Sequence, residues 1–401
     1  MNKASSSSLL KEEKMGKVYR IDDAEFKKRW KAVQKGVKEK GLDLLIAHSG
    51  EADFANVRYL SDYWPIFECA GVIVPKEGEP ALLIGPESET FARDTSRIPK
   101  IYKLVEYRES AEPEYPDIKV DTFSSIFKEM LGGNVKKIGL ASYQIFPLPV
   151  YEGIRKAAPK AELIKSDELI VDLRIIKSAV ELDMLQESFR IAETALEKTL
   201  PLMKPDMTEL QVVGIIEKEL YSEGAEYEGH PQYVLAGRNS NHAIGRPGYA
   251  KLGRSNLIQL NIGARVAGYS SSVGRPVCIG PMTPPMKKLV QAGLDMHFKT
   301  TEWMKAGVRA NEVVKKFYEY GDRIGVAKNI LYGPCHGLGM MEVEKPWMES
   351  RSEYLLQENM TFQVDTFLYC EDYGLRWENG VVVTKDGVKP FSDKLNKILE
   401  L

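Results

Sequence analysis

Hydrophobic and polar residues alternate along the first 165 positions with the periods of helices and short strands. Residues 22–41 follow the helical period, because the first turn is acidic, Phe26, Trp30 and Val33 share one face, and Gly41 ends the repeat. Short apolar runs predict strands at 42–48, 70–76, 80–85, 136–143 and 161–166, and a helix at 148–159. This alternation predicts a small α/β domain.

The pattern changes near residue 166. Residues 166–205 predict one long amphipathic helix with an acidic entry, and Thr208 is the expected N-cap of the next helix. Later blocks predict strands within 233–237 and 257–280, helices within 284–325, and final strands at 360–370 and 374–387. We therefore expect a disordered tail at 1–16 and two domains, 17–165 and 166–401, of the α/β (α+β) class.

Composition narrows the class of protein. The chain has 401 residues, 43% hydrophobic and 28% charged, which is typical of a soluble globular protein. Its net charge of -2 gives no electrostatic reason to expect nucleic acid or membrane as a partner. The four cysteines form no CxxC pair, and the N-terminus lacks the apolar core of a secretory signal. We expect a cytoplasmic enzyme or binding protein.

Three residues in the second half stand out as candidates for chemistry. His336 lies in the glycine-rich CHGLG stretch, where a ligand can approach the backbone closely. Asp365 and Glu378 interrupt otherwise apolar strands, and an unpaired carboxylate is costly to bury. Such an acid normally has a metal, an arginine or a substrate cation as its partner. The alternative is structural: a histidine that only packs, and acids that face solvent or pair with Arg376.

Several motifs resemble those of one enzyme group. The stretches ANVRYLSDYW, DLRIIKSAVELDML, GYSSSVGRPVCIG, HGLGMMEVEKP and GLRWENGVVVTKDG are similar to segments of the creatinase, prolidase and aminopeptidase P group of the pita-bread (M24-like) superfamily. The resemblance covers most of the chain from about Glu25 to Gly387. It implies a small creatinase-like N-terminal domain followed by a C-terminal pita-bread domain.

The resemblance also implies a metal site, which this sequence changes. Metal-dependent members hold two divalent cations with two aspartates, a histidine and two glutamates. The corresponding positions here are Asn261, Ser272, His336, Asp365 and Glu378. Two carboxylates in place of four cannot balance two divalent ions, so we do not expect a dinuclear centre. A single Mn, Co or Zn ion on His336, Asp365 and Glu378 is the alternative to a site without a cofactor.

The proton-handling histidines of the family are also replaced. They correspond to Ile244 and Val343, although Glu344 is kept, and His242 could take the place of the first after a small loop shift. Creatinase shares the fold, uses no metal and has Asn at the position of Asn261. It depends, however, on a histidine at the position of Ile244 and on a glutamate at that of Gly274.

Three functions remain open at this stage. The first is a metal-independent hydrolase that cleaves a C–N bond of a small cationic or zwitterionic compound. In it, Asp365 and Glu378 hold the cation and His336 or His242 transfers protons, while the expected substrate-binding residues are Asn261, Ser272, Tyr269, Arg376 and Glu344. The second is an Xaa-Pro dipeptidase or aminopeptidase with one metal ion. The third is an inactive pita-bread protein that binds a ligand.

The resemblance implies a homodimer as well. In family members with this N-terminal domain, that domain of one chain reaches the site of the other. Residues 48–64 and Phe67 are therefore expected to line the partner's pocket, although the same aromatic residues could simply be core.

Overall fold

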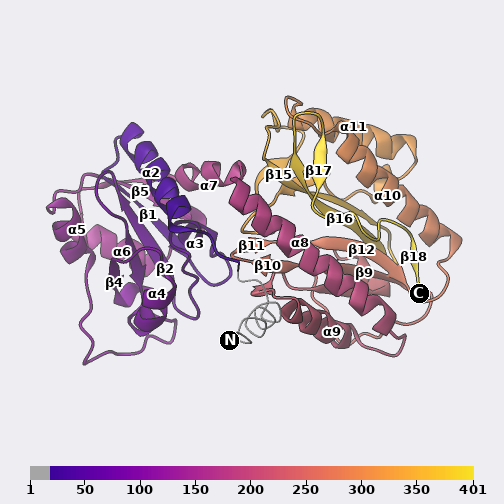
Figure 1. The fold of residues 1–401 in the computed structure, drawn as a ribbon, viewed down its shortest axis with the longest axis horizontal. Helices are drawn as coiled ribbons and strands as arrows, with labels where there is room; N and C mark the ends of the chain where they lie inside the picture. Colours follow the sequence, from indigo (N-terminus) through magenta and orange to yellow (C-terminus); the bar gives the residue numbers. More distant parts are fainter. Residues whose placement is uncertain (1–18) are drawn as a thin grey trace, which may run out of the picture. The chain divides into compact units, whose positions relative to one another are not determined.

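The computed structural model describes residues 19–401, which divide into two compact units: Ile21–Arg174, and Ile175–Leu401 together with residues 19–20. The predicted tail, residues 1–16, lies outside the described residues. Both units mix strands and helices, so the predicted α/β class is confirmed (Figure 1). Within residues 19–401, no helix is long and apolar enough to cross a membrane.

The first unit is built on one mixed sheet with the strand order β4-β3-β2-β1-β5-β6. Strand β1 pairs parallel with β5 and antiparallel with β2. The strands are β1 Leu44–Ser49, β2 Ala70–Pro75, β3 Ala81–Ile84, β4 Ile101–Lys103, β5 Lys137–Ala141 and β6 Glu162–Lys165. The helices are α2 Asp23–Glu39, α3 Ala55–Ser61, α4 Glu89–Thr95, α5 Phe123–Leu131, α6 Leu148–Ala157 and α7 Glu168–Ile175, with the short 3-10 helices η1 Pro86–Ser88, η2 Val105–Tyr107 and η3 Tyr143–Ile145.

Helix α2 begins and ends where the sequence predicts. The side chain of Asp22 accepts a hydrogen bond from the Glu25 amide, and Gly41 adopts the left-handed φ of 64° that suits glycine after a helix. Its predicted apolar face is buried. Of the aromatic residues expected near a partner's pocket, Phe54 and Tyr63 are buried in this unit, whereas Phe67 is 81% exposed.

The second unit contains a large sheet with the order β14-β13-β15-β16-β12-β9-β8 and a smaller one, β11-β10-β7. Its strands are β7 Tyr227–Glu228, β8 Tyr233–Ala236, β9 Leu257–Ile262, β10 Ala264–Val266, β11 Tyr269–Ser270, β12 Val273–Cys278, β13 Cys335–Gly337, β14 Glu344–Met348, β15 Thr361–Tyr369, β16 Gly374–Val383, β17 Val388–Pro390 and β18 Leu399–Glu400. The helices are α8 Ala179–Thr199, α9 Glu209–Ser222, α10 Pro284–Trp303 and α11 Ala310–Arg323, with η4 Leu200–Leu202, η5 Gly237–Asn241 and η6 Ala327–Asn329.

Helices cover both faces of this unit (Figure 1). Helix α10 packs on β15 and β16, where Trp377 is fully buried and donates its indole N–H to the Val290 carbonyl. Helix α8 packs on β10 and β11, and α9 packs along β8. Side chains of successive strand residues point to opposite faces, so Trp377 and its neighbour Glu378 lie on different sides of the sheet.

Strand register places the candidate polar residues in one row. Asn261 of β9 lies opposite Gly274 of β12, Gly274 lies opposite Glu378 of β16, and Glu378 lies opposite Asp365 of β15. His336 of β13 lies opposite Gln363, two residues before Asp365 on the same face. Residues far apart in sequence are therefore brought together by strand pairing alone.

The prediction of one long helix over residues 166–205 is wrong in one respect, because the helix is interrupted between α7 and α8. Ser178 and Glu181 form a capping box that starts α8 anew. The side chain of Lys177 pairs with Glu344 at 3.0 Å, and Ile176 forms an isolated bridge with Met360. These contacts hold the break in an extended form. Thr208 is the N-cap of α9, as predicted.

The buried carboxylate of Glu209 holds the segment that follows β8. It accepts hydrogen bonds from the Ala236 amide at 2.8 Å, the Asn239 side chain at 3.0 Å and the Gly248 amide at 2.7 Å. The first turn of α9 is thereby tied to both ends of residues 236–248. This segment includes Ile244, so Glu209 fixes the backbone of a residue that the sequence analysis placed near the site.

We predict that Glu209→Ala lowers the free energy of unfolding by about 3 kcal/mol, because two buried backbone amides lose their acceptor. Denaturant unfolding of the full chain measures the change. Glu197→Ala is the matched control, since Glu197 is 41% exposed, and it should change stability by less than about 0.5 kcal/mol. Equal effects of the two substitutions would contradict this role for Glu209.

Candidate active site

A cavity of about 320 Å³ lies over the polar row of the large sheet. This volume suits a small molecule. Its floor is polar and its mouth is apolar. The cavity is lined by His230, Tyr233, Ala243, Ile244, Asn261, Ser272, Leu331, Tyr332, His336, Glu342, Val343, Trp347, Asp365, Arg376 and Glu378.

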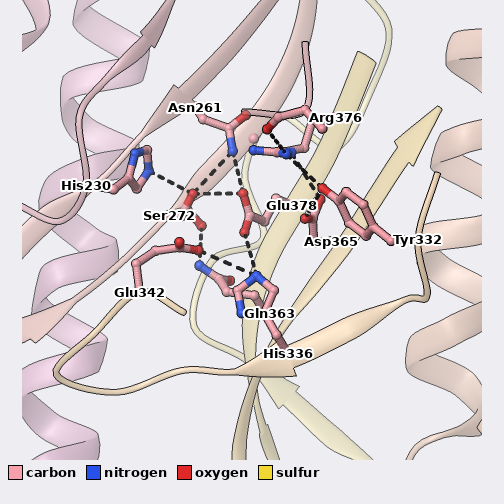
Figure 2. Close-up of polar contacts among 12 residues, drawn as sticks. His230, Asn261, Ser272, Tyr332, His336, Glu342, Gln363, Asp365, Arg376 and Glu378 are labelled. Carbon is pink, nitrogen blue, oxygen red and sulfur yellow. Dashed lines mark hydrogen bonds and ion pairs between the residues drawn. The ribbon is translucent and has the colours of Figure 1, made fainter. Parts of the chain in front are cut away.

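Glu378 is at the centre of the floor and is compensated by neutral donors. Figure 2 shows Asn261 and Ser272 turned toward its carboxyl group. The amide of Asn261 donates to Oε2 of Glu378, and Oγ of Ser272 lies 2.8 Å from the same oxygen. Burial, followed by the charges of Asp365 and Glu342, raises the pKa of Glu378 well above its usual range. The residues that replace the two family aspartates therefore bind a carboxyl group.

Glu342 forms a compact group with His336 and Glu378. Nε2 of His336 lies 3.7 Å from Glu342 Oε1 and 3.8 Å from Glu378 Oε1, and one possible ligand atom from each of the three lies within 4.8 Å of the others. Nδ1 of His336 is 3.1 Å from the Gly337 carbonyl, so this nitrogen carries the proton and Nε2 faces the acids. Burial raises the pKa of Glu342 to about 7.

Sequence reasoning missed Glu342. It lies in the loop between β13 and β14, where no period reveals which side chains point inward. The signal was its charge in HGLGMMEVEKP, a stretch otherwise rich in apolar residues. We had expected Asp365 as the third member of this group.

Asp365 instead belongs to a second polar group with Arg376 and Tyr332 (Figure 2). Its Oδ1 lies 3.2 Å from Nε of Arg376, and its Oδ2 accepts a hydrogen bond of 2.5 Å from the Tyr332 hydroxyl. Nη2 of Arg376 donates to that hydroxyl and to the Ala243 carbonyl, both at 2.7 Å. The structural alternative considered for Asp365, a pair with Arg376, is therefore what the structure shows.

His230 is a second residue that the sequence did not reveal. Its Nδ1 lies 2.7 Å from the Pro231 carbonyl, and its Nε2 lies 3.0 Å from Oγ of Ser272. A carbonyl only accepts, so Nδ1 carries the proton and Nε2 carries none; Nε2 can accept the one hydroxyl proton of Ser272 only when that proton is not donated to Glu378. Burial lowers the pKa of His230 to about 4, which keeps the ring neutral near pH 7.

Three predicted site residues do not line the cavity. The Tyr269 hydroxyl donates to Glu181 at 2.5 Å, and Glu344 is paired with Lys177, so both contacts anchor α8 and the chain before it. His242 is exposed at the end of η5. The segment after η5 is not a strand, and it does not bring His242 into the cavity lining as a replacement for the family histidine. Ile244 lines the mouth instead.

The space around Gly274 is too small for the glutamate that creatinase has at the corresponding position. A Cβ atom there would lie 2.8 Å from Cβ of Glu378 and 3.0 Å from Oδ1 of Asn261. Both distances are too short for an ordinary contact, so a larger residue would separate Asn261 from Glu378. The glycine permits the hydrogen bond between these neighbouring strands.

The fold and the site define a class: a two-unit α/β protein with an imidazole–carboxylate cluster on a sheet. Residues 183–385 match metallopeptidase family M24, and residues 29–176 match the creatinase/prolidase N-terminal domain. The chain belongs to metallopeptidase family M24. The C-terminal unit therefore has the pita-bread fold that the motifs implied.

Named relatives support this assignment. The chain is 25% identical to an Xaa-Pro dipeptidase of Pyrococcus horikoshii over 338 residues, 83% of this chain and 89% of that protein. The crystal structure of X-Pro aminopeptidase from Thermotoga maritima superposes with a TM-score of 0.81 at 20% identity, over 93% of this chain and 99% of that one. The prolidase of Pyrococcus horikoshii gives 0.79 at 21% identity over the same shares. These structures share the fold.

The residues present fit one divalent cation better than two. One imidazole nitrogen and two carboxylates are a suitable donor set for a single Mn, Co or Zn ion. A second ion would need anionic oxygens, but Asn261 and Ser272 are neutral and donate to Glu378, and Asp365 is already paired with Arg376. Within residues 19–401, Oδ1 of Asn261 is buried without a hydrogen-bond partner, and it is one neutral oxygen near the cluster.

We predict that Asp365→Ala lowers the free energy of unfolding by about 3–5 kcal/mol, because it leaves the Arg376 guanidinium buried without its acid. The double variant Asp365→Ala/Arg376→Met should recover most of that loss, as measured by a double-mutant cycle in denaturant. Glu302→Ala is the control, since the Lys299–Glu302 pair is exposed and should contribute less than about 1 kcal/mol. A loss for Asp365→Ala no larger than the control would refute this pairing role.

Proposed function

We propose that this protein is a hydrolase that cleaves a C–N bond of a small, dipeptide-like substrate with one divalent cation held by His336, Glu342 and Glu378. The observation that carries the proposal is this cluster of donors on the cavity floor. The Xaa-Pro dipeptidase relatives favour an amide bond as the target. A bound divalent cation supplies Lewis-acid polarisation of a carbonyl and makes a water more acidic.

The chain's own groups have separate tasks in this proposal. Nε2 of His336 presents a lone pair to the cavity because Nδ1 donates to Gly337. The Glu342 carboxylate accepts a proton from the attacking water and returns it to the leaving nitrogen. Glu342 can do so because its side chain lines the cavity in which the substrate would bind. Asn261 and Ser272 hold Glu378 in position through Oε2, which leaves Oε1 directed toward His336.

A metal-free hydrolase of a cationic compound is the second candidate, and one observation favours it. Neutral residues occupy both positions of the family aspartates, so the negative charge of the floor is reduced to what an organic cation could balance. Glu342 and Glu378 would then bind the substrate cation directly through charge-assisted hydrogen bonds. An inactive binding protein, the third function considered, predicts no turnover in any of the assays below.

We predict about one ion per chain when chelator-treated protein is dialysed against Mn²⁺, Co²⁺ or Zn²⁺ and measured by elemental analysis. Glu342→Gln and His336→Gln should each weaken binding at least tenfold in calorimetric titration, because removal of only a hydrogen-bond partner of a metal ligand already costs about ten- to a hundredfold in affinity. Glu349→Gln is the control, because Glu349 is exposed on the chain after β14. Hydrolysis of Xaa-Pro dipeptides and related amides should follow metal content.

Two results would overturn the single-ion proposal. Hydrolysis of guanidino, ureido or cyclic amidine compounds by the chelated protein, with no ion bound, would establish the metal-free candidate. Two ions per chain would show that neutral Asn261 and Ser272 suffice for a dinuclear site. The homodimer and the cytoplasmic location remain predictions.

A further inference from the structure

The mouth of the cavity differs in chemistry from its floor. Ile244 is 89% exposed, Leu331 50%, Val343 46% and Trp347 38%, and all four line the cavity. Large apolar side chains that are exposed around a concave site mark surface that a ligand covers. Their continuity with the polar floor indicates a ligand with a polar reacting end and an apolar end.

The charged side chains that line the cavity lie at its floor and not at its mouth. Among the described residues that line the cavity, the acids are Glu342, Asp365 and Glu378, and the single lysine or arginine is Arg376. Its guanidinium is engaged by Asp365, Tyr332 and the Ala243 carbonyl, and it lies 5.5 Å from the Tyr233 ring and 5.3 Å from the Phe367 ring. The mouth itself offers a carboxylate no cationic partner from this lining.

Nearby arginines do not change this picture. Arg238 and Arg246 flank His242 in sequence and are positively charged groups near the segment that carries Ile244. Both are exposed, and neither lines the cavity. A carboxylate bound against Ile244, Val343 and Leu331 would lose part of its hydration and gain no ion pair from the cavity lining, which is unfavourable.

We propose that the apolar mouth, formed by Ile244, Leu331, Val343 and Trp347, is a subsite for an uncharged apolar group of the substrate. The protein then prefers amides whose group beyond the scissile bond lacks a free carboxylate. This inference rests on the proposed hydrolysis of a C–N bond and specifies its substrate class: dipeptide amides, alkyl amides and aryl amides rather than free dipeptides.

The test compares matched substrates that differ in one group. Hydrolysis of an Xaa-Pro dipeptide and of its C-terminal amide is measured on metal-loaded wild-type protein. We expect kcat/KM for the amide to exceed that for the acid by at least about tenfold, since an unpaired buried charge costs more than an unpaired neutral group. Equal values, or a preference for the acid, would overturn the subsite.

Substitutions at the mouth locate the preference. Ile244→Arg should raise kcat/KM for the acid, relative to that for the amide, about fivefold, because it supplies a cation near the carboxylate. Val343→Arg tests the same effect from a second position at the mouth. Ile244→Gln should raise KM for the amide about threefold to tenfold with little change in kcat, because apolar contact is lost. Tyr249→Arg is the matched control, since Tyr249 is 86% exposed and does not line the cavity. Loss of acid turnover in Arg246→Gln would instead identify Arg246 as a carboxylate receptor and refute the proposal.

A binding experiment separates this inference from the proposed function. The probes are an Xaa-Pro analogue with a reduced, uncleavable CH₂–N bond, as the acid and as the amide, titrated by calorimetry into the metal-loaded protein. The subsite is supported if the amide analogue binds about tenfold more tightly than the acid analogue, even if no substrate is hydrolysed. This difference in affinity should become smaller in Ile244→Arg and stay the same in Tyr249→Arg. Turnover of both substrates with equal binding of both analogues refutes the subsite and leaves the hydrolase standing.

Discussion

The burial of several acidic side chains on one face of a sheet is the constraint that shapes the C-terminal unit. Strand pairing places Glu378 beside Asp365, and the loop after β13 brings Glu342 to the same cavity. Like charges at such short range raise each other's pKa and would destabilise the fold if nothing compensated them. Much of the local structure is the set of groups that provides this compensation.

Each acid is compensated differently, and the difference assigns its role. Asp365 is neutralised by Arg376 and Tyr332, which makes it a structural member of the site. Glu378 accepts hydrogen bonds from Asn261 and Ser272 through its Oε2, and its Oε1 lies 3.8 Å from Nε2 of His336. Glu342 has its carboxylate directed toward His336 and the cavity. One oxygen of Glu342 and one of Glu378 therefore lie beside the same imidazole nitrogen, where a single cation can be held.

The parts of the fold and of the candidate site that the sequence predicted are those in segments with a regular apolar period or a family motif. Apolar period and end signals predicted α2, every strand of the first unit's sheet except β4, the strands β8, β9, β12, β15 and β16 of the large sheet, and the Thr208 cap, because these features are local. Position in a family motif predicted that Asn261, Ser272, His336, Asp365 and Glu378 lie close together. Strand register brings four of them together, and Ser272 joins through side-chain hydrogen bonds to Asn261 and Glu378. The capping box Ser178-x-x-Glu181 was present in the sequence, but the apolar period ran across the break and hid it.

Glu342 and His230 escaped prediction for a common reason. Both lie outside the named strands, where side-chain direction is set by loop geometry and not by a period. The prediction that Tyr269 and Glu344 bind substrate was wrong for the opposite reason, because we took a match to a family motif as a sign of substrate contact. Their partners, Glu181 and Lys177, belong to α8 and the chain before it, which cannot be deduced from the motifs alone.

Arg275 shows how a scaffold can stay constant while the chemistry above it changes. Its guanidinium is fully buried and, within residues 19–401, forms no ion pair; it donates to the carbonyls of Gly274 at 2.7 Å and Glu378 at 3.1 Å, and to Asn379 at 2.8 Å. Burial lowers its pKa to about 10, so it stays charged at neutral pH. A positive charge behind β12 and β16 favours acids on the opposite face whatever they bind. The strands therefore remain paired with neutral Asn261 and Ser272 in front of them, and the same backbone can present its acids to one ion or to a substrate cation.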